Sequence, residues 1–392
     1  MITRIEAKNY RSLFDVSQEL KPFQILIGPN ATGKSTFLDV VSFVGDIVRF
    51  GVKEGCNKRS KNFLDLTFNK KGGPIEFAFE FKTIGLFAYG IPPDLNFPDD
   101  AIFRYEIKIR QDKVNPPEIY WEKITLATPS GLKELMVRTE SGNISFNPFP
   151  NEDGYPPSLR TNGDRTGLSF VPEGVSGFSD ISWLIQFFGN QIVSIDLNGN
   201  VLKSAGNPGQ GLKLLSSGEN LPWIIEDLKT NQKERFELWL AHIKMALPDV
   251  SDILINTVPD LNQRYISILY ASGTSIPSWM LSDGTLRFLA LTIIAYLPDP
   301  SQIYLIEEPE NGVHPKILEA VYQSLSSVYD AQIFVATHSP LLLGIAGKEN
   351  LLLFNKAENG NTTIESGSDN PYLMEWNSEI DLGTIFASGI LG

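Results

Sequence analysis

The sequence predicts an α/β protein. Three short apolar runs, at 23–27, 303–306 and 332–337, have the length and composition of buried strands. A helix-like pattern at 36–44 follows the first run, and another at 315–329 separates the other two. A strand, a helix and a second strand at this spacing form a βαβ unit of ordinary size. We therefore expect parallel strands flanked by helices.

The middle of the chain predicts an inserted, β-rich lobe. Residues 75–81 and 103–109 alternate between apolar and charged side chains, which is typical of half-buried antiparallel strands. Two further strand-like runs lie near 119–126 and 135–139. Residues 147–175 are rich in Pro, Gly, Asn and Asp and predict a long loop.

Composition and charge limit the class of protein. The chain has 392 residues, of which 42% are hydrophobic, and no apolar run is long enough for a transmembrane helix. The first residues lack the apolar core of a signal peptide. A single cysteine, Cys56, fits a reducing compartment, so we expect a cytoplasmic protein with no membrane partner. The net charge of −13 argues against a broad basic surface for nucleic acid.

Residues 28–36 carry the most specific motif in the chain. They match the phosphate-binding pattern G-x-x-x-x-G-K-[ST] and lie between a predicted strand and a predicted helix. Such a turn aims backbone N–H groups and the positive end of the helix dipole at one point, where polyphosphate binds. The alternative is a chance match in a glycine-containing turn. The candidate nucleotide-binding residues are Asn30, Ala31, Thr32, Gly33, Lys34, Ser35 and Thr36.

Two side chains of this motif have expected roles. Lys34 would reach the β- and γ-phosphates of the nucleotide, and the Ser35 hydroxyl would ligate Mg²⁺. ATP and Mg²⁺ are therefore the expected ligands.

A second candidate is the string Leu281–Thr285, which precedes a helical pattern at 286–297. Ser282 and Gly284 at a helix start, with free N–H groups, can bind an anion. When the string is taken alone, an ordinary N-cap explains these two residues equally well. Residues 215–219 carry a similar string, and only position separates the two, because 281–285 lies one helix before the next motif.

That next motif places acidic residues at a strand end. The strand at 303–306 runs into Glu307 and Glu308, at the edge where open α/β sheets bind ligands. One carboxylate can hold the metal shell while its neighbour polarises a water, although an acidic turn is the simpler alternative. His338 follows the next predicted strand. A lone histidine there is usually structural, but beside the acids it becomes a candidate sensor of the γ-phosphate.

The order of these motifs resembles the ATP-binding-cassette (ABC) class of ATPases, in the soluble branch of SMC, RecF and OLD-type proteins. In that class they are the Walker A, signature, Walker B and switch-histidine motifs. Residues 307–315 are especially similar to OLD-like AAA family ATPases and to ATPase subunits of bacterial anti-phage defence systems. Residues 9–13 are similar to the N-terminal Asn-Phe-Arg-Ser element, which nominates Arg11 as a nucleotide contact. The resemblance covers roughly 1–45 and 275–345.

The resemblance implies a P-loop ABC-type head, with a mixed sheet flanked by helices, the inserted lobe and a helical signature subdomain. In this class two heads sandwich two ATP molecules, and the signature of one subunit contacts the γ-phosphate held by the other. Glu308 would be the catalytic carboxylate, Glu307 the metal ligand in place of the usual Asp, and His338 the γ-phosphate contact. Gln186 and Gln191 are Q-loop candidates by elimination only. The implied divisions are 1–60 and 301–392 for the two halves of the head, 61–200 for the lobe and 201–300 for the signature subdomain.

Three functions stay open at this point. The first is an ATP-hydrolysing, dimeric or larger switch that controls a separately encoded effector, such as a nuclease, in phage defence. OLD nucleases carry a nuclease domain after the ATPase, and the residues after Pro340 contain no Asp-x-Asp pair for its metals. The second is a RecF-like repair ATPase that clamps DNA, which the acidic charge disfavours. The third is a scaffold that hydrolyses ATP negligibly, which Glu308 and His338 disfavour.

Overall fold

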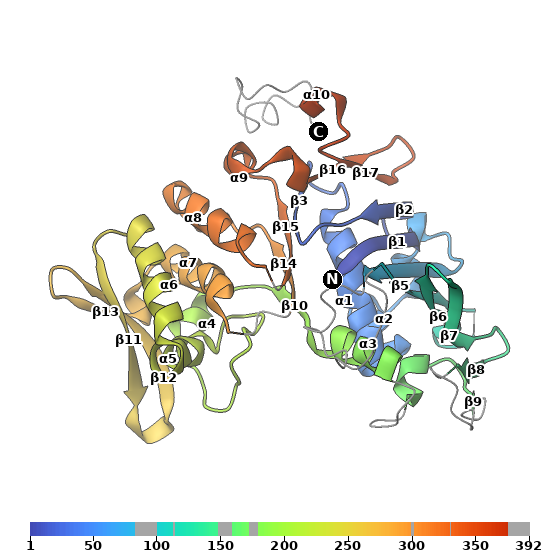
Figure 1. Ribbon diagram of the computed structural model, residues 1–392, viewed down its shortest axis with the longest axis horizontal. Helices are drawn as coiled ribbons and strands as arrows, with labels where there is room; N and C mark the ends of the chain where they lie inside the picture. Colours follow the sequence, from blue (N-terminus) through green and yellow to red (C-terminus); the bar gives the residue numbers. More distant parts are fainter. Residues whose placement is uncertain are drawn as a thin grey trace. The chain divides into compact units, whose positions relative to one another are not determined.

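The computed structural model describes residues 1–82, 100–112, 114–147, 159–171, 179–298, 302–329 and 331–374 (Figure 1). The chain divides into two compact units, which are described separately. Unit 1 consists of Met1–Pro22, Gly28–Ile192 and Leu352–Glu365. Unit 2 consists of Phe23–Ile27, Val193–Leu351 and Ser366–Gly392.

Unit 1 is built on an eight-stranded antiparallel sheet in the order β2-β1-β4-β5-β6-β7-β8-β9. Phe79 lies opposite Tyr105 and Ile5 in the register, and all three are fully buried. The predicted β-rich lobe is confirmed, and the first two strands of the chain extend the same sheet. The strands are β1 (Ile2–Tyr10), β2 (Leu13–Glu19), β4 (Ile75–Lys82), β5 (Ile102–Arg110), β6 (Glu118–Thr128), β7 (Gly131–Arg138), β8 (Asn143–Phe146) and β9 (Leu159–Arg160).

Three helices cover the apolar face of this sheet: α1 (Lys34–Phe50), α2 (Val52–Asn57) and α3 (Ser179–Asn190) (Figure 1). Phe43 of α1 stacks on Tyr10 of β1, with ring centroids 5.4 Å apart. Trp183 of α3 meets Phe81 of β4 edge to face at 5.2 Å. Aromatic packing of this kind adds to the burial of apolar area and fixes both helices on the sheet. Residues 352–365 add most of a hairpin, β16 (Leu351–Lys356) and β17 (Thr362–Ser366).

The described part of the predicted loop at 147–175 is tied to the sheet by a buried ion pair. Arg138 and Glu122 are fully buried, 3.3 Å apart, and Arg138 also donates to Arg165 O. Glu122 accepts from the backbone N–H of Gly167 at 2.7 Å. Burial raises the pKa of the Glu122 carboxyl. A buried charge is tolerated only when it is paired and hydrogen-bonded, so this cluster anchors residues 159–171.

Unit 2 contains strands in the order β10-β14-β15-β3, and the β14–β15 and β15–β3 pairs are parallel. They are β10 (Ile192–Ile195), β14 (Ile303–Glu307), β15 (Gln332–Thr337) and β3 (Phe23–Ile27). In the register Glu307 lies opposite Ala336, and Thr337 lies opposite Ile27. Helix α8 (Pro315–Ser326) connects β14 to β15, which confirms the predicted βαβ unit. The carboxyl ends of β14, β15 and β3 therefore share one edge.

The signature region of unit 2 is helical, with one addition. Helices α4 (Gly199–Lys203), α5 (Leu221–Asn231), α6 (Lys233–Ala246) and α7 (Asp283–Thr292) are followed later in the chain by α9 (Pro340–Ile345) and α10 (Pro371–Met374). The indole of Trp239 in α6 donates to Thr292 of α7 at 3.0 Å. A three-stranded antiparallel sheet, β11 (Val250–Val258), β12 (Gln263–Tyr270) and β13 (Ser275–Pro277), was not predicted.

The four-part division of the chain stays a prediction. Of the predicted loop at 147–175, residues 148–158 and 172–175 lie outside the described residues. None of the helices in the described ranges is long and apolar enough to cross a membrane.

Candidate nucleotide-binding site

The phosphate loop joins β3 to α1. It begins at Gly28, directly after the end of β3, and α1 starts at Lys34 with Gly33 as its N-cap in the left-handed conformation (φ 105°). A Cβ atom on Gly28 would lie 2.1 Å from Phe354 O, and one on Gly33 would lie 2.2 Å from Thr362 Oγ1. Both positions therefore require glycine because the β16–β17 hairpin packs directly against the loop.

Lys34 folds over its own loop. Its ammonium donates to Gly28 O at 2.6 Å and to Pro29 O at 2.9 Å, and the Thr32 hydroxyl donates to Pro29 O at 2.8 Å. The ammonium therefore lies over the turn whose N–H groups and helix dipole favour an anion. Asn30, Ala31 and Ser35 are exposed, Lys34 and Thr36 are half-buried, and Thr32 and Gly33 are buried.

Arg11 is held over α1 by an ionic cluster in unit 1. Its guanidinium lies 3.0 Å from Oδ2 of Asp39, a residue of α1. The Tyr10 hydroxyl donates to the same oxygen at 2.5 Å, and Arg59 binds Oδ1 at 2.6 Å. Burial, reinforced by the Asp39 charge, raises the pKa of Tyr10. Arg11 itself has a positive φ of 49°, and its N–H donates to Leu66 O.

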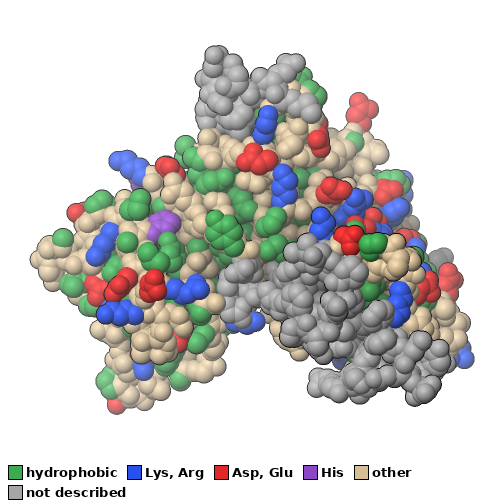
Figure 2. Space-filling model, viewed as in Figure 1, with side chains coloured by type: hydrophobic (Ala, Val, Ile, Leu, Met, Phe, Trp, Pro, Cys, Tyr) green, Lys and Arg blue, Asp and Glu red, His purple; other side chains and the backbone are tan. Residues whose placement is uncertain are grey.

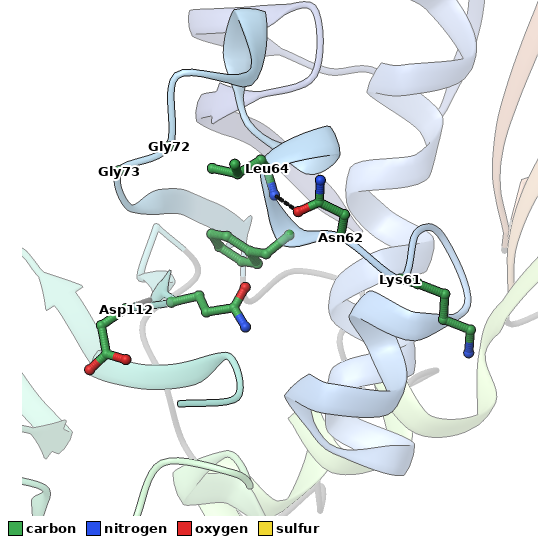
Figure 3. Close-up of a pocket in the computed structure, with 8 residues that line it drawn as sticks. Lys61, Asn62, Leu64, Gly72, Gly73 and Asp112 are labelled. Atoms are coloured by element: carbon green, nitrogen blue, oxygen red, sulfur yellow. Dashed lines mark hydrogen bonds between the residues drawn. The ribbon is translucent and has the colours of Figure 1, made fainter. Parts of the chain in front are cut away.

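Asn9, also with a positive φ (56°), braces the neighbouring 68–74 turn. Its amide nitrogen donates to Gly72 O and Pro74 O, and its oxygen accepts from Phe68 N. Beside this turn lies a groove of about 440 Å³ (Figure 3). It is lined by Lys61, Asn62, Phe63, Leu64, Gly72, Gly73, Gln111 and Asp112, and it contains none of the predicted site residues. Lys61 and Asp112 lie on opposite sides of it (Figure 3), so we assign it no ligand.

In unit 2, Ser282 is the N-cap of α7. Its Oγ accepts from Thr285 N at 3.0 Å, which is the geometry of an N-cap whether or not an anion binds. Lys203 hydrogen-bonds Asp283 at 2.5 Å and lowers the pKa of that carboxyl. A Cβ atom on Gly284 would lie 2.2 Å from Gly312 O, so the start of α7 packs against the turn that follows β14. The similar string at 215–219 lies in turns before α5, whose N-cap is Asn220.

Glu308 and His338 meet at the carboxyl edge of the unit 2 strands. Glu308 has a positive φ of 48°, and its N–H donates to Ala336 O at 2.8 Å. One oxygen of its carboxylate lies 3.4 Å from Nδ1 of His338, and the other accepts from Asn311 at 2.5 Å. Glu307 is exposed at the tip of β14. The structure thus brings the predicted base and the predicted γ-phosphate contact together.

A residue that the sequence analysis did not nominate supports this pair. Glu310 Oε1 accepts from the Thr337 hydroxyl at 2.6 Å and from His338 N at 3.2 Å, and it lies 3.7 Å from His338 Nδ1. The Glu310 side chain is 11% exposed, and its Oε2 is buried without a hydrogen-bond partner. Glu310 therefore ties the turn after β14 to the end of β15. The only sequence signal was a third acid in Glu-Glu-Pro-Glu.

The two Q-loop candidates and His242 differ in their burial and in their hydrogen-bond partners. Gln186 is exposed and accepts from Asn190, whereas Gln191 is buried and its amide oxygen has no partner. His242 contacts Tyr296 Oη and Ala320 O, and burial lowers its pKa, as expected of a packed histidine.

Solved structures with a similar fold include heads of SMC proteins. One is described as the crystal structure of the SmcHead bound to the C-winged helix domain of ScpA, with 16% identity and a TM-score of 0.55 over 93% of this chain and 96% of that one. Another is the Smc head domain with an extended coiled coil bound to the C-terminal domain of ScpA, derived from Pyrococcus furiosus. It has 15% identity and a TM-score of 0.52 over 100% of this chain and 98% of that one. The fold is that of an ABC-type P-loop ATPase head.

A comparison of the sequence with known protein families matches part of the chain. Residues 162–344 match the family described as "AAA domain, putative AbiEii toxin, Type IV TA system". Among curated proteins, no sequence matches the chain. The family match includes the signature string, the acidic strand end and His338, but it begins after the phosphate loop. Residues 162–344 are therefore similar to this AAA-domain family, and the fold of the chain is similar to that of SMC heads.

Proposed function

We propose that the chain binds and hydrolyses Mg²⁺-ATP and acts as an ATP-gated dimeric switch that controls a separate effector in phage defence. The observation that carries the ATPase part is the pairing of Glu308 with His338 at the carboxyl edge of β14, β15 and β3. Strand β3 continues directly into the phosphate loop at Gly28. In open α/β sheets ligands bind outside such strand ends.

Each residue has a role in the proposed reaction. The N–H groups of the loop and Lys34 bind the phosphates, and Arg11 adds a second cation. Glu308 accepts a proton from the attacking water as the water oxygen bonds to the γ-phosphorus. The bond from the γ-phosphorus to the bridging oxygen breaks, and ADP leaves. His338 donates to the γ-phosphate.

The metal would be held by few protein atoms. Mg²⁺ in nucleotide sites keeps several waters and binds phosphates plus one or two protein oxygens, and it neutralises charge that develops on the phosphates. Ser35 in the first turn of α1 and Glu307 at the tip of β14 fit that role, because both are exposed at motif positions. Within the described ranges, no group of three or more Asp, Glu, His or Cys residues could hold a metal ion.

The partner assignment rests on the comparisons. ABC-class heads work as ATP sandwiches, which would place Ser282 and Gly284 of one copy on the γ-phosphate of the other. The similar SMC heads are described as bound to a domain of another protein, ScpA, which supports a separate partner here. The family description names a toxin–antitoxin system, which supports a defence role.

A DNA clamp is the less favoured function. The polar face of the unit 1 sheet mixes acids and bases, and Figure 2 shows the two intermingled around β1 and β2. Arg104 pairs with Glu6 and Glu80, and Lys108 pairs with Glu76. Paired charges of this kind do not form the basic groove that DNA requires.

The test is phosphate release from Mg²⁺-ATP by the wild-type chain and by Glu308→Gln. Removal of the general base should lower turnover by about 10²- to 10⁴-fold while ATP still binds. Equal turnover in both proteins would exclude Glu308 as the base. Stimulation of the wild-type rate by duplex DNA, lost steeply with added salt, would favour the DNA clamp instead.

A further inference from the structure

The C-terminal hairpin of unit 1 contacts the phosphate loop from more than 300 positions away in the sequence. The Thr362 hydroxyl oxygen lies 2.8 Å from Thr32 O and 2.9 Å from Ser12 Oγ, and Thr362 N donates to Ser12 O at 2.9 Å. Thr362 is 1% exposed. No motif in the sequence draws attention to this threonine.

The direction of these hydrogen bonds follows from chemistry. A hydroxyl has one hydrogen, and a carbonyl oxygen can only accept. The Thr362 hydroxyl is therefore the donor to Thr32 O, and its contact to Ser12 Oγ shares the same hydrogen. Ser12 belongs to the N-terminal Asn9–Leu13 element, so this element, the hairpin and the phosphate loop meet at one buried hydroxyl.

The hydrogen bond from Thr362 to Thr32 O orients the peptide group between Thr32 and Gly33. A trans peptide is planar, so its C=O and N–H point in opposite directions. When the carbonyl is fixed toward Thr362, the Gly33 N–H is fixed away from the hairpin. Gly33 also has no room to move toward Thr362, because even a Cβ atom there would lie 2.2 Å from the hydroxyl.

We propose that Thr362 is a positioning residue for nucleotide binding, which aims the Gly33 N–H at the phosphates by holding the Thr32 carbonyl. This inference rests on the proposed function. Thr362 does not touch the nucleotide, so it should act on affinity for ATP and not on the chemical step. Preorganised donors bind more tightly because less ordering is required when the ligand arrives.

The test compares two adjacent threonines of β17. Thr362→Val keeps the shape of the side chain and removes the hydroxyl, whereas Thr363→Val changes an exposed neighbour whose hydroxyl makes only a 3.4 Å contact to Asn355 O. ATP binding is measured with a fluorescent ATP analogue, and turnover at saturating ATP. Thr362→Val should raise the Kd about 3- to 30-fold, the range expected when a buried carbonyl loses its donor. Its kcat should stay within about twofold, and Thr363→Val should match the wild type.

Two further variants separate positioning from a general loss of stability. Thr362→Ser keeps the hydroxyl and should restore the wild-type Kd, even if its melting temperature stays low. Thr362→Ala also removes the hydroxyl and should raise the Kd at least as much as Thr362→Val does. It serves as the test if Thr362→Val does not fold. An unchanged Kd in Thr362→Val or, if that variant does not fold, in Thr362→Ala would overturn the inference, as would failure of Thr362→Ser to restore binding. If the wild type and Thr363→Val do not bind ATP, the proposed function itself fails.

Discussion

The phosphate loop in unit 1 and the acidic edge in unit 2 are supported in different ways. The loop is braced by residues distant in the chain, with Phe354 O against Gly28 and Thr362 against Gly33. The acidic edge is braced by a near neighbour, since Glu310 lies two residues after Glu308 and binds the next strand at Thr337. A loop that binds phosphate through backbone N–H groups needs its peptides fixed, whereas a base and a histidine need their side chains fixed.

This difference predicts separate effects on binding and on turnover. Changes around the phosphate loop should act on affinity for ATP. Changes at the acidic edge and at the signature should act on hydrolysis while ATP still binds.

The largest effect that we expect on ATP binding is that of Lys34→Ala. Loss of a charge-assisted contact to phosphate should weaken ATP binding by about 10²-fold, measured by titration calorimetry. Lys61→Ala is the matched control, because this lysine lines the separate groove of unit 1 and should leave the affinity unchanged. Normal ATP affinity in Lys34→Ala would contradict the assignment of the phosphate loop.

The next effect is on hydrolysis, in Ser282→Arg. A bulky cation at the start of α7 should block the sandwich, so turnover should fall to background while each chain still binds ATP. Ser216→Arg, in the similar string at 215–219, should retain turnover because that string does not start a helix. Normal hydrolysis by Ser282→Arg would rule out the two-headed site.

The smallest effect is expected at Glu310. Glu310→Ala removes the acceptor for Thr337 and for His338 N, and it should lower kcat by about 10-fold with little change in KM. Glu310→Gln keeps an acceptor oxygen and should retain more of the rate. A rise in KM at constant kcat would show that Glu310 acts on ATP binding, and it would remove the contrast between the two regions.

The sequence allowed prediction of the motifs and of most elements, because both depend on short-range patterns. The βαβ unit of β14, α8 and β15, with its parallel strands, was predicted in this way. Strands β11 and β12 were missed because only part of each is buried, so the apolar alternation is incomplete. Glu310 and Thr362 could not be predicted. Their roles depend on which strand ends meet in space, and a single acid or threonine carries no pattern.

The most direct test of the central claim is the solution mass of Glu308→Gln with and without ATP and Mg²⁺, measured by light scattering. A variant that binds ATP without hydrolysing it should accumulate the sandwich, so we predict a shift from one chain to two on addition of Mg²⁺-ATP. Lys34→Ala in the Glu308→Gln background should show no shift. A protein that stays monomeric while binding ATP would contradict the dimeric switch and leave only nucleotide binding.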